Sequence, residues 1–500
     1  MNQIRVGAII SYIALAINIL IGIFYTPWMI SSIGRENFGL YTLAMSIISL
    51  FIFDFGLSAA VTRFIAKYIA LGRQDLANKA LGIVYKLYIY IDILLIVALT
   101  CIYFFIPYIY QELSVEEIEQ FKVVYMVAAV FSVISFPFIP INGILTAHER
   151  IIQLKLSDVF QKLLIIGSMT IALLLGGGLY TLVLINAIAG VICIIIKVLC
   201  IYRYTNQRVV WNNKDKSELK AIASFSGWAS ILALAQRCIF NLAPSILGMV
   251  SGSVAIAILG IAITIEGYCF TFANAINGIF LPRVSRILLK EQGDILPLMI
   301  KVGRIQLMII AFIVIAFICF GDNFIYVWVG NGFTNSYICA VLLIIPSLFH
   351  LPQMIGNEAI YAKNEVKRLS IVYVAMAICN IVGAFILAPR WGAYGICISI
   401  CIAYFIRTLG MDYILIKQLG INLARFFNHT YVKLLPILVS TTFIGLLLTN
   451  LLGSDSWATL IIKLTLFGII YFLSLYFFAL NSFEKGLIVG PLKSIVRRLH

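Results

Sequence analysis

Three charged side chains lie deep inside long apolar runs of the sequence: Asp54, Arg237 and Glu266. A charge at the centre of a lipid bilayer costs roughly 2.5–3.5 kcal/mol on insertion scales, so each group needs a partner, a water-filled cavity or a bound ligand. An arginine at this depth attracts an anionic ligand. These three residues are therefore the first candidates for a binding site.

Each of the three charges has polar neighbours on one face of its predicted helix, because residues three, four or seven positions apart share a side. The polar stripes are Asp54, Ser58 and Thr62; Ser230, Arg237, Asn241 and Ser245; and Glu266, Asn274 and Asn277. A polar stripe on an otherwise apolar helix indicates a water-filled cavity or a buried polar seam. The predicted substrate-binding residues are Asp54, Ser58, Arg237, Asn241, Glu266, Asn274 and Asn277.

A purely structural role is the main alternative for the three charges. A salt bridge from Arg237 to Glu266 or to Asp54 would hold neighbouring helices together and would offset the cost of placing these charges in the bilayer. The two roles are compatible, because a resting salt bridge opens when an anionic ligand takes the arginine. We favour a cavity-lining role for Arg237, whereas for Asp54 and Glu266 the sequence favours neither role.

The composition indicates that these residues lie in a membrane. Of the 500 residues, 62% are hydrophobic and 11% are charged, against roughly 25% charged in soluble globular proteins. Apolar stretches long enough to cross a bilayer recur from end to end. The fourteen predicted spans are 6–30, 38–62, 80–106, 122–146, 157–175, 179–202, 222–249, 253–281, 298–320, 336–360, 369–388, 392–415, 432–452 and 457–480. The predicted fold class is therefore an all-α polytopic membrane protein with about fourteen transmembrane helices.

The formal net charge of +15 is explained by the distribution of basic residues. Connections rich in Lys and Arg alternate with connections poor in them, as expected when the basic loops stay in the cytoplasm. This pattern predicts cytoplasmic N- and C-termini and gives no reason to expect a nucleic-acid partner. Trp28, Trp328, Trp391 and Trp457 fall at the predicted outer interface, where indole side chains prefer to lie.

An internal repeat divides the chain. Residues 142–150 precede a helix, a glycine-containing turn and another helix, and residues 357–365 begin the same order 215 positions later. Six spans are thus repeated in the same orientation, which places the axis that relates them along the membrane normal. We predict two pseudo-symmetric six-helix bundles, residues 1–210 and 211–425. Two additional spans and a basic cytoplasmic tail follow in residues 426–500.

Several kinds of chemistry lack their usual residues. The ten cysteines all fall in apolar runs, and no His or acid accompanies Cys397 and Cys401, so no disulfide framework or metal site is predicted. Gly176, Gly177 and Gly178 are not followed by Lys and Ser or Thr, so they do not form a phosphate-binding loop for ATP. We predict no cofactor and no enzymatic activity. Energy for transport would come from an H+ or Na+ gradient, or from the substrate's own gradient.

Two motifs resemble a known family. One comprises Gly34, Phe38, Gly39, Tyr41, the Phe-Asp-Phe-Gly-Leu sequence 53–57, Arg63 and Asp75, and the other is IYVWVGNGF at 325–333. Both are similar to motifs of bacterial polysaccharide flippases of the Wzx type. These flippases belong to the multidrug/oligosaccharidyl-lipid/polysaccharide exporter (MOP) superfamily, which also contains multidrug extruders and flippases of peptidoglycan precursors. The resemblance covers nearly the whole chain and implies a MATE-like fold.

The resemblance implies that the substrate is an undecaprenyl-pyrophosphate-linked oligosaccharide, the repeat unit of an O-antigen, a capsule or an exopolysaccharide. Alternating access would carry its sugar and pyrophosphate across the bacterial inner membrane in a hydrophilic cavity, while the polyprenyl tail stays in lipid. Arg237 would face the diphosphate, and Asn241, Asn274 and Asn277 would suit sugar hydroxyls. The other implied partners are membrane lipid and membrane proteins of polysaccharide assembly.

Two alternatives remain open. A cation-coupled multidrug extruder of the same superfamily would be favoured by an acid-rich cavity, whereas the deepest charge in the predicted span 222–249 is the basic Arg237. A membrane glycosyltransferase or polymerase of polysaccharide synthesis would be expected to carry a large extracytoplasmic loop or exposed paired carboxylates. The sequence shows neither of these features.

Overall fold

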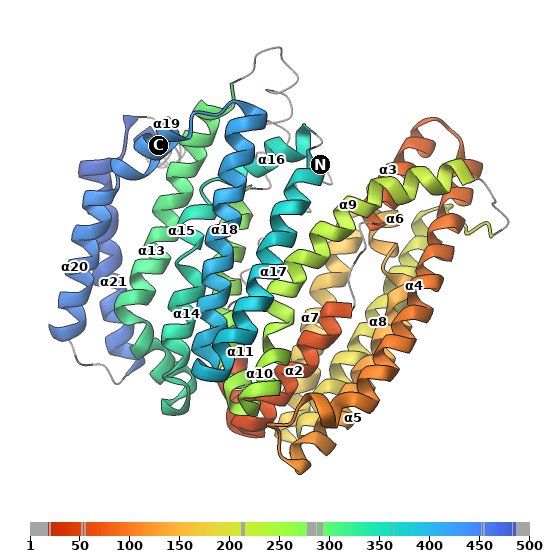
Figure 1. Cartoon of the computed structure of the whole chain (residues 1–500), viewed down its shortest axis with the longest axis horizontal. Helices are drawn as coiled ribbons and strands as arrows, with labels where there is room; N and C mark the ends of the chain where they lie inside the picture. Colours follow the sequence, from red (N-terminus) through yellow and green to blue (C-terminus); the bar gives the residue numbers. More distant parts are fainter. Residues whose placement is uncertain are drawn as a thin grey trace, which may run out of the picture. The chain divides into compact units, whose positions relative to one another are not determined.

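Helices make up all the regular secondary structure in the part of the chain that the structure describes (Figure 1). This computed structural model describes residues 19, 22–51, 54, 57–211, 216–277, 287, 294–363, 365–451, 453, 456–482 and 484–486. Within these residues, 11 helices are long and apolar enough to cross a membrane, or up to 12 if a bent pair counts as one span. The predicted all-α multi-pass membrane protein is confirmed, whereas the count of fourteen spans is not.

The described spans correspond to the third to fourteenth predicted spans. They are α4 (Gln74–Ile109), α5 (Val115–Ser135) with α6 (Ile141–Ala147), α7 (Ile151–Leu174), α8 (Leu179–Tyr204), α9 (Lys216–Asn241) with α10 (Ala243–Val250), α11 (Gly252–Asn277), α13 (Leu296–Val329), α14 (Ser336–Ile344) with α15 (Ser347–His350) and α16 (Met354–Ala362), α17 (Val366–Trp391), α18 (Ala393–Leu419), α19 (Leu423–Phe427) with α20 (Leu435–Leu451), and α21 (Trp457–Ser474). The first predicted span, 6–30, lies largely outside the described residues.

The second predicted span is divided. The sequence predicts one helix over 38–62, but α2 (Arg35–Phe51) ends near the middle of this stretch and a second helix, α3 (Leu57–Ala70), begins beyond it. Asp54, between them, is not helical. A helix end leaves backbone N–H or C=O groups without intrahelical partners, and these must be satisfied by other groups inside a membrane. The break therefore creates a need for polar side chains at this depth.

Prolines interrupt the fourth and tenth predicted spans. A proline cannot donate to the helix and clashes with the preceding turn, so it kinks a membrane helix. In the fourth span, Pro137 lies within a short 3₁₀ turn, η1 (Phe136–Phe138), between α5 and α6, and Pro140 directly precedes α6. In the tenth span, Pro346 and Pro352 accompany a bend of 62° between α14–α15 and α16.

The two bent spans end in the same kind of turn. After α6, the backbone N–H of Arg150 donates to the carbonyl of Leu145 over 2.8 Å, and after α16 that of Glu365 donates to Ile360 over 3.1 Å. In each turn the donor follows the acceptor by five positions. The two turns lie 215 positions apart, which is the spacing of the sequence repeat. The local geometry of these turns thus agrees with the predicted repeat.

The chain forms two compact units, comprising residues 1–260 with 366–403, and residues 261–365 with 404–500. In the first unit, α3 packs against α4 and α6, and α9 packs against α2, α3 and α17. In the second unit, α20 and α21 pack against each other and against α13, and the three helices lie side by side (Figure 1). The helix α11 begins in the first unit and continues into the second.

Candidate transport site

Asp54 stabilises the start of α3 from within the break. Its carboxylate Oδ1 accepts a hydrogen bond of 2.8 Å from the backbone N–H of Ser58, in the first turn of α3. The first N–H groups of a helix carry a partial positive charge, so a carboxylate at this end is favourable. Two predicted site residues, Asp54 and Ser58, are therefore in direct contact.

A second hydrogen bond to Asp54 comes from α4. The hydroxyl Oη of Tyr88 donates to Oδ1 of Asp54 over 3.1 Å. Tyr88 is 0% exposed, and its ring lies 5.2 Å from the ring of Phe136. Because its ring is enclosed, this tyrosine holds its hydroxyl in one place. The Asp54 carboxylate is thus fixed by donors from two helices.

Arg237 reaches the other side of the break. From α9, its Nη1 donates to the backbone carbonyl of Ser49 and, over 3.3 Å, to the Ser49 hydroxyl. Ser49 lies in the last turn of α2, where carbonyls lack intrahelical partners and carry a partial negative charge. A cation at the end of α2 and an anion at the start of α3 therefore each match the adjoining helix end. Asp54 follows Ser49 by five positions, so the carboxylate lies in the same broken span that the guanidinium contacts.

The helix α3 is anchored to the kinked fourth span. The hydroxyls of Ser58 and Thr62 donate to the carbonyls of Ile139 and Gly143, over 3.3 and 3.2 Å. A Cβ at Gly143 would lie only 2.6 Å from the carbonyl oxygen of Ser58, so this close approach requires glycine. Two members of the predicted stripe, Ser58 and Thr62, thus hold helices together.

The structure describes the remaining predicted site residues in different detail. Asn241 is the last residue of α9, one turn beyond Arg237, and is half-buried. Glu266 lies in α11 within the second unit and is 6% exposed. Asn274 and Asn277 occupy the last turns of α11, and their side chains lie outside the described residues.

Sequence analysis missed two residues that contact the site, Tyr88 and Ser49. Tyr88 is an aromatic residue in an apolar span, and only its hydroxyl signals a hydrogen-bonding role. Ser49 acts through its backbone carbonyl as well as its hydroxyl, and a backbone contact leaves no mark in the sequence. Knowledge of the helix break would have drawn attention to both residues.

The arrangement is suited to binding an anion at Arg237. A guanidinium carries N–H donors on three nitrogens, and the hydrogen bonds described for Arg237 all come from Nη1. Donors therefore remain for phosphate or carboxylate oxygens. Among the described residues, no cluster of three or more His, Cys, Asp or Glu has the geometry to hold a metal ion.

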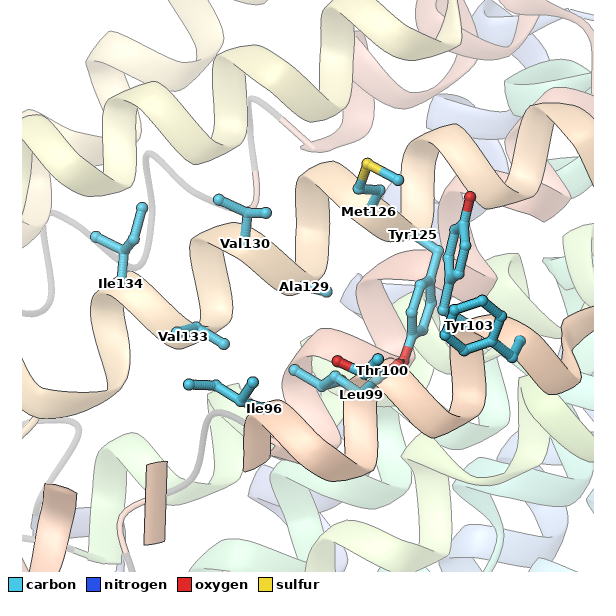
Figure 2. A pocket seen from close by; sticks show the side chains of 11 residues that line it. Ile96, Leu99, Thr100, Tyr103, Tyr125, Met126, Ala129, Val130, Val133 and Ile134 are labelled. Atoms are coloured by element: carbon cyan, nitrogen blue, oxygen red, sulfur yellow. The ribbon is translucent and has the colours of Figure 1, made fainter. Parts of the chain in front are cut away.

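Two apolar grooves have linings that include none of Asp54, Arg237 and Glu266. In the first unit, a groove of about 420 Å³ runs between α4 and α5, where Ile96, Leu99 and Tyr103 face Tyr125, Ala129 and Val133 (Figure 2). In the second unit, a groove of about 770 Å³ lies between α13 and α21 and includes Met308, Gly468 and Phe472. Both are lined mainly by hydrocarbon side chains, so neither is suited to a sugar or a pyrophosphate.

Comparison of the sequence with protein families gave one match. The profile of the family described as polysaccharide biosynthesis protein matches residues 4–288, which is more than half of the chain. The chain belongs to this family. No curated protein matches it. Membership agrees with the resemblance seen in the motifs around Asp54 and extends through α11, as far as residue 288.

Solved structures share the fold of this family member. The lipid II flippase MurJ in an inward closed conformation aligns with a TM-score of 0.67 and 12% identity, over 94% of this chain and 98% of that chain. An inward-facing multidrug resistance MATE family transporter of the MOP superfamily aligns with a TM-score of 0.63 and 15% identity, over 77% of this chain and 91% of that chain. A MATE in complex with MaD3S aligns with a TM-score of 0.53 and 16% identity, over 82% of this chain and 94% of that chain. The chain therefore belongs to the polysaccharide biosynthesis protein family and has the fold of the MurJ and MATE structures.

Proposed function

We propose that this protein is a flippase that moves an undecaprenyl-pyrophosphate-linked oligosaccharide from the inner to the outer leaflet of the bacterial cytoplasmic membrane by alternating access. The family concerns polysaccharide biosynthesis, and the fold is shared with a lipid II flippase. The alternation of basic connections supports cytoplasmic N- and C-termini. The moving parts would be the two predicted bundles, 1–210 and 211–425, with 426–500 as an addition.

The observation that carries this proposal is Arg237 at the break in the second span. A pyrophosphate needs a cation to cross the centre of a bilayer, and a guanidinium pairs with phosphate oxygens through two parallel hydrogen bonds. Arg237 has donors beyond Nη1 for this purpose. Asn241, one turn further along α9, and Asn274 and Asn277 would suit sugar hydroxyls. Asp54, Ser58 and Glu266 would line the cavity.

A flipping assay tests the proposal. Purified protein is placed in vesicles that contain undecaprenyl pyrophosphate bearing a fluorescent sugar, and a reductant that does not cross the bilayer bleaches the label in the outer leaflet. Vesicles with the protein should lose all of their fluorescence, because the protected inner-leaflet label is carried outwards. Vesicles without protein provide the control. Inner-leaflet label that stays protected in the presence of folded protein would contradict the proposal.

A cation-coupled multidrug extruder is the second candidate, because MATE family transporters share the fold. The same vesicles distinguish the two functions. An extruder would move an organic cation against its gradient when an H+ or Na+ gradient is imposed, and it would leave the lipid-linked label in place. A flippase should give the opposite pair of results.

A further inference from the structure

The break in the second span keeps two opposite charges near each other without joining them. Arg237 contacts Ser49, which precedes Asp54 by five positions, yet the hydrogen bonds that the structure describes for the two charged groups do not join them. The arginine donates to Ser49, and the aspartate accepts from Ser58 and Tyr88. A direct salt bridge would occupy the guanidinium and cancel its charge. Something must therefore hold the carboxylate away from it.

The two donors to Asp54 differ in what they contribute. The Ser58 N–H belongs to the backbone of α3, so it moves with that helix. The Tyr88 hydroxyl belongs to α4, a different helix from the one that Asp54 precedes. Its ring is enclosed against Phe136, which leaves the hydroxyl little freedom. Tyr88 is thus a rigidly held donor on a neighbouring helix, and it keeps the Asp54 carboxylate in place.

We propose that Tyr88 is a positioning residue that holds Asp54 away from Arg237 and so keeps the guanidinium available to the pyrophosphate of the substrate. This inference rests on the proposed function, because it assigns the anion to Arg237. Tyr88 touches no substrate itself; it acts through Asp54. Among the described residues, loss of its hydroxyl leaves the carboxylate with the Ser58 N–H as its donor. The carboxylate is then free to turn towards Arg237.

The test measures binding of undecaprenyl pyrophosphate, without sugar, to the full-length protein in nanodiscs. Tyr88→Phe keeps the ring and its packing on Phe136 but removes the hydroxyl. A hydrogen bond to a charged group accounts for roughly a tenfold change in an equilibrium constant, so Tyr88→Phe should bind the probe about tenfold more weakly. Tyr103→Phe is the matched control on the same helix, because the Tyr103 ring packs against Tyr125 in the groove between α4 and α5. This control should bind like the wild type.

Rescue separates positioning from a merely structural role. In the double variant Tyr88→Phe with Asp54→Asn, the neutral amide cannot cancel the charge of Arg237, so binding should recover. Asp54→Asn alone should bind the probe more tightly than the wild type for the same reason. A structural defect caused by loss of the hydroxyl would not be repaired by a second substitution that also weakens the contact.

Each outcome decides the matter. Weaker binding in Tyr88→Phe that Asp54→Asn restores supports the positioning role. Wild-type binding in Tyr88→Phe overturns it, as does weak binding in the double variant. Arg237→Ala distinguishes this failure from that of the proposed function: if the probe binds normally without Arg237, both are wrong. If Arg237→Ala abolishes binding while Tyr88→Phe has no effect, only the role of Tyr88 is wrong.

Discussion

Two buried arginines of this protein are held in very different ways. Arg304, on α13, is 5% exposed and forms a bidentate pair with Glu484, Nε to Oε1 over 2.6 Å and Nη2 to Oε2 over 3.2 Å. Its guanidinium also donates to the carbonyls of His429 and Ala479, over 2.9 and 3.0 Å. Arg237, on α9, is half-buried, and among the described residues its hydrogen bonds run from Nη1 to Ser49.

The difference separates a structural arginine from one that is available for a ligand. All three guanidinium nitrogens of Arg304 are used, and they join α13 to the segment after α21. Arg237 has a carboxylate nearby, but that carboxylate is bound to Tyr88 and Ser58. A burial value alone would rank Arg304 as the more unusual charge. The number of donors left over identifies Arg237 as the candidate for substrate.

The largest effect on stability is expected at the Arg304–Glu484 pair. Arg304→Ala should lower the free energy of unfolding by about 3–5 kcal/mol, because it leaves the Glu484 carboxylate buried without its partner. Thermal unfolding of the purified protein in detergent measures the change. The double variant Arg304→Met with Glu484→Leu should recover much of the loss, because no charge is then left buried. Equal destabilisation by Arg304→Ala and Arg237→Ala would undo the distinction between the two arginines.

A smaller loss is expected at Asp54. Asp54→Ala removes the acceptor for the Ser58 N–H at the start of α3, and loss of such a cap typically costs about 0.5–2 kcal/mol. Hydrogen exchange of the Ser58 amide should increase, while amides at the start of α4 serve as the internal control. Unchanged exchange at Ser58 would mean that the carboxylate does not stabilise this helix end.

The smallest effect concerns pH, and it lies outside the membrane spans. Burial lowers the pKa of His148, and nearby Arg150 adds to this, while a hydrogen bond with Gln207 opposes it. The unfolded chain therefore binds the proton more readily, so stability is retained above the ordinary pKa of about 6.5 and is lost as the pH falls below it. Solvent screening keeps this loss small.

Thermal unfolding at a series of pH values measures this loss, and His148→Gln should remove its share of the pH dependence. Neither Arg237 nor Arg304 should contribute, because a guanidinium stays charged in this range. If the pH dependence of stability persists in His148→Gln but disappears in Arg237→Lys, it arises at the break between α2 and α3 and not at His148.

The sequence was sufficient to locate α4 and the spans after it, but not to locate the breaks within spans. Apolar length and the Lys and Arg pattern located α4 and the spans after it, because both signals are averaged over about twenty residues. The division of the second span between Phe51 and Leu57 depends on a few residues around Asp54. Periodicity cannot detect it, since the apolar run continues through the break.

For the site, the sequence identified charges but not the contacts between them. Asp54, Ser58 and Arg237 were found because charged and polar residues are rare inside apolar spans. The Tyr88 contact links residues 34 positions apart and the Ser49 contact links residues 188 positions apart. Such pairings are set by how α4 and α9 pack on the broken span, which no single stretch of sequence encodes.

Substitution of Arg237 is the most direct test of the account. Cells that depend on this protein for surface polysaccharide are given Arg237→Ala, and both the polysaccharide and the amount of protein in the membrane are measured. Arg208→Ala, on the exposed segment after α8, is the control. The account predicts that Arg237→Ala reaches the membrane but yields no surface polysaccharide, whereas Arg208→Ala yields the normal amount. Normal polysaccharide with Arg237→Ala would contradict the claim that this arginine carries the pyrophosphate.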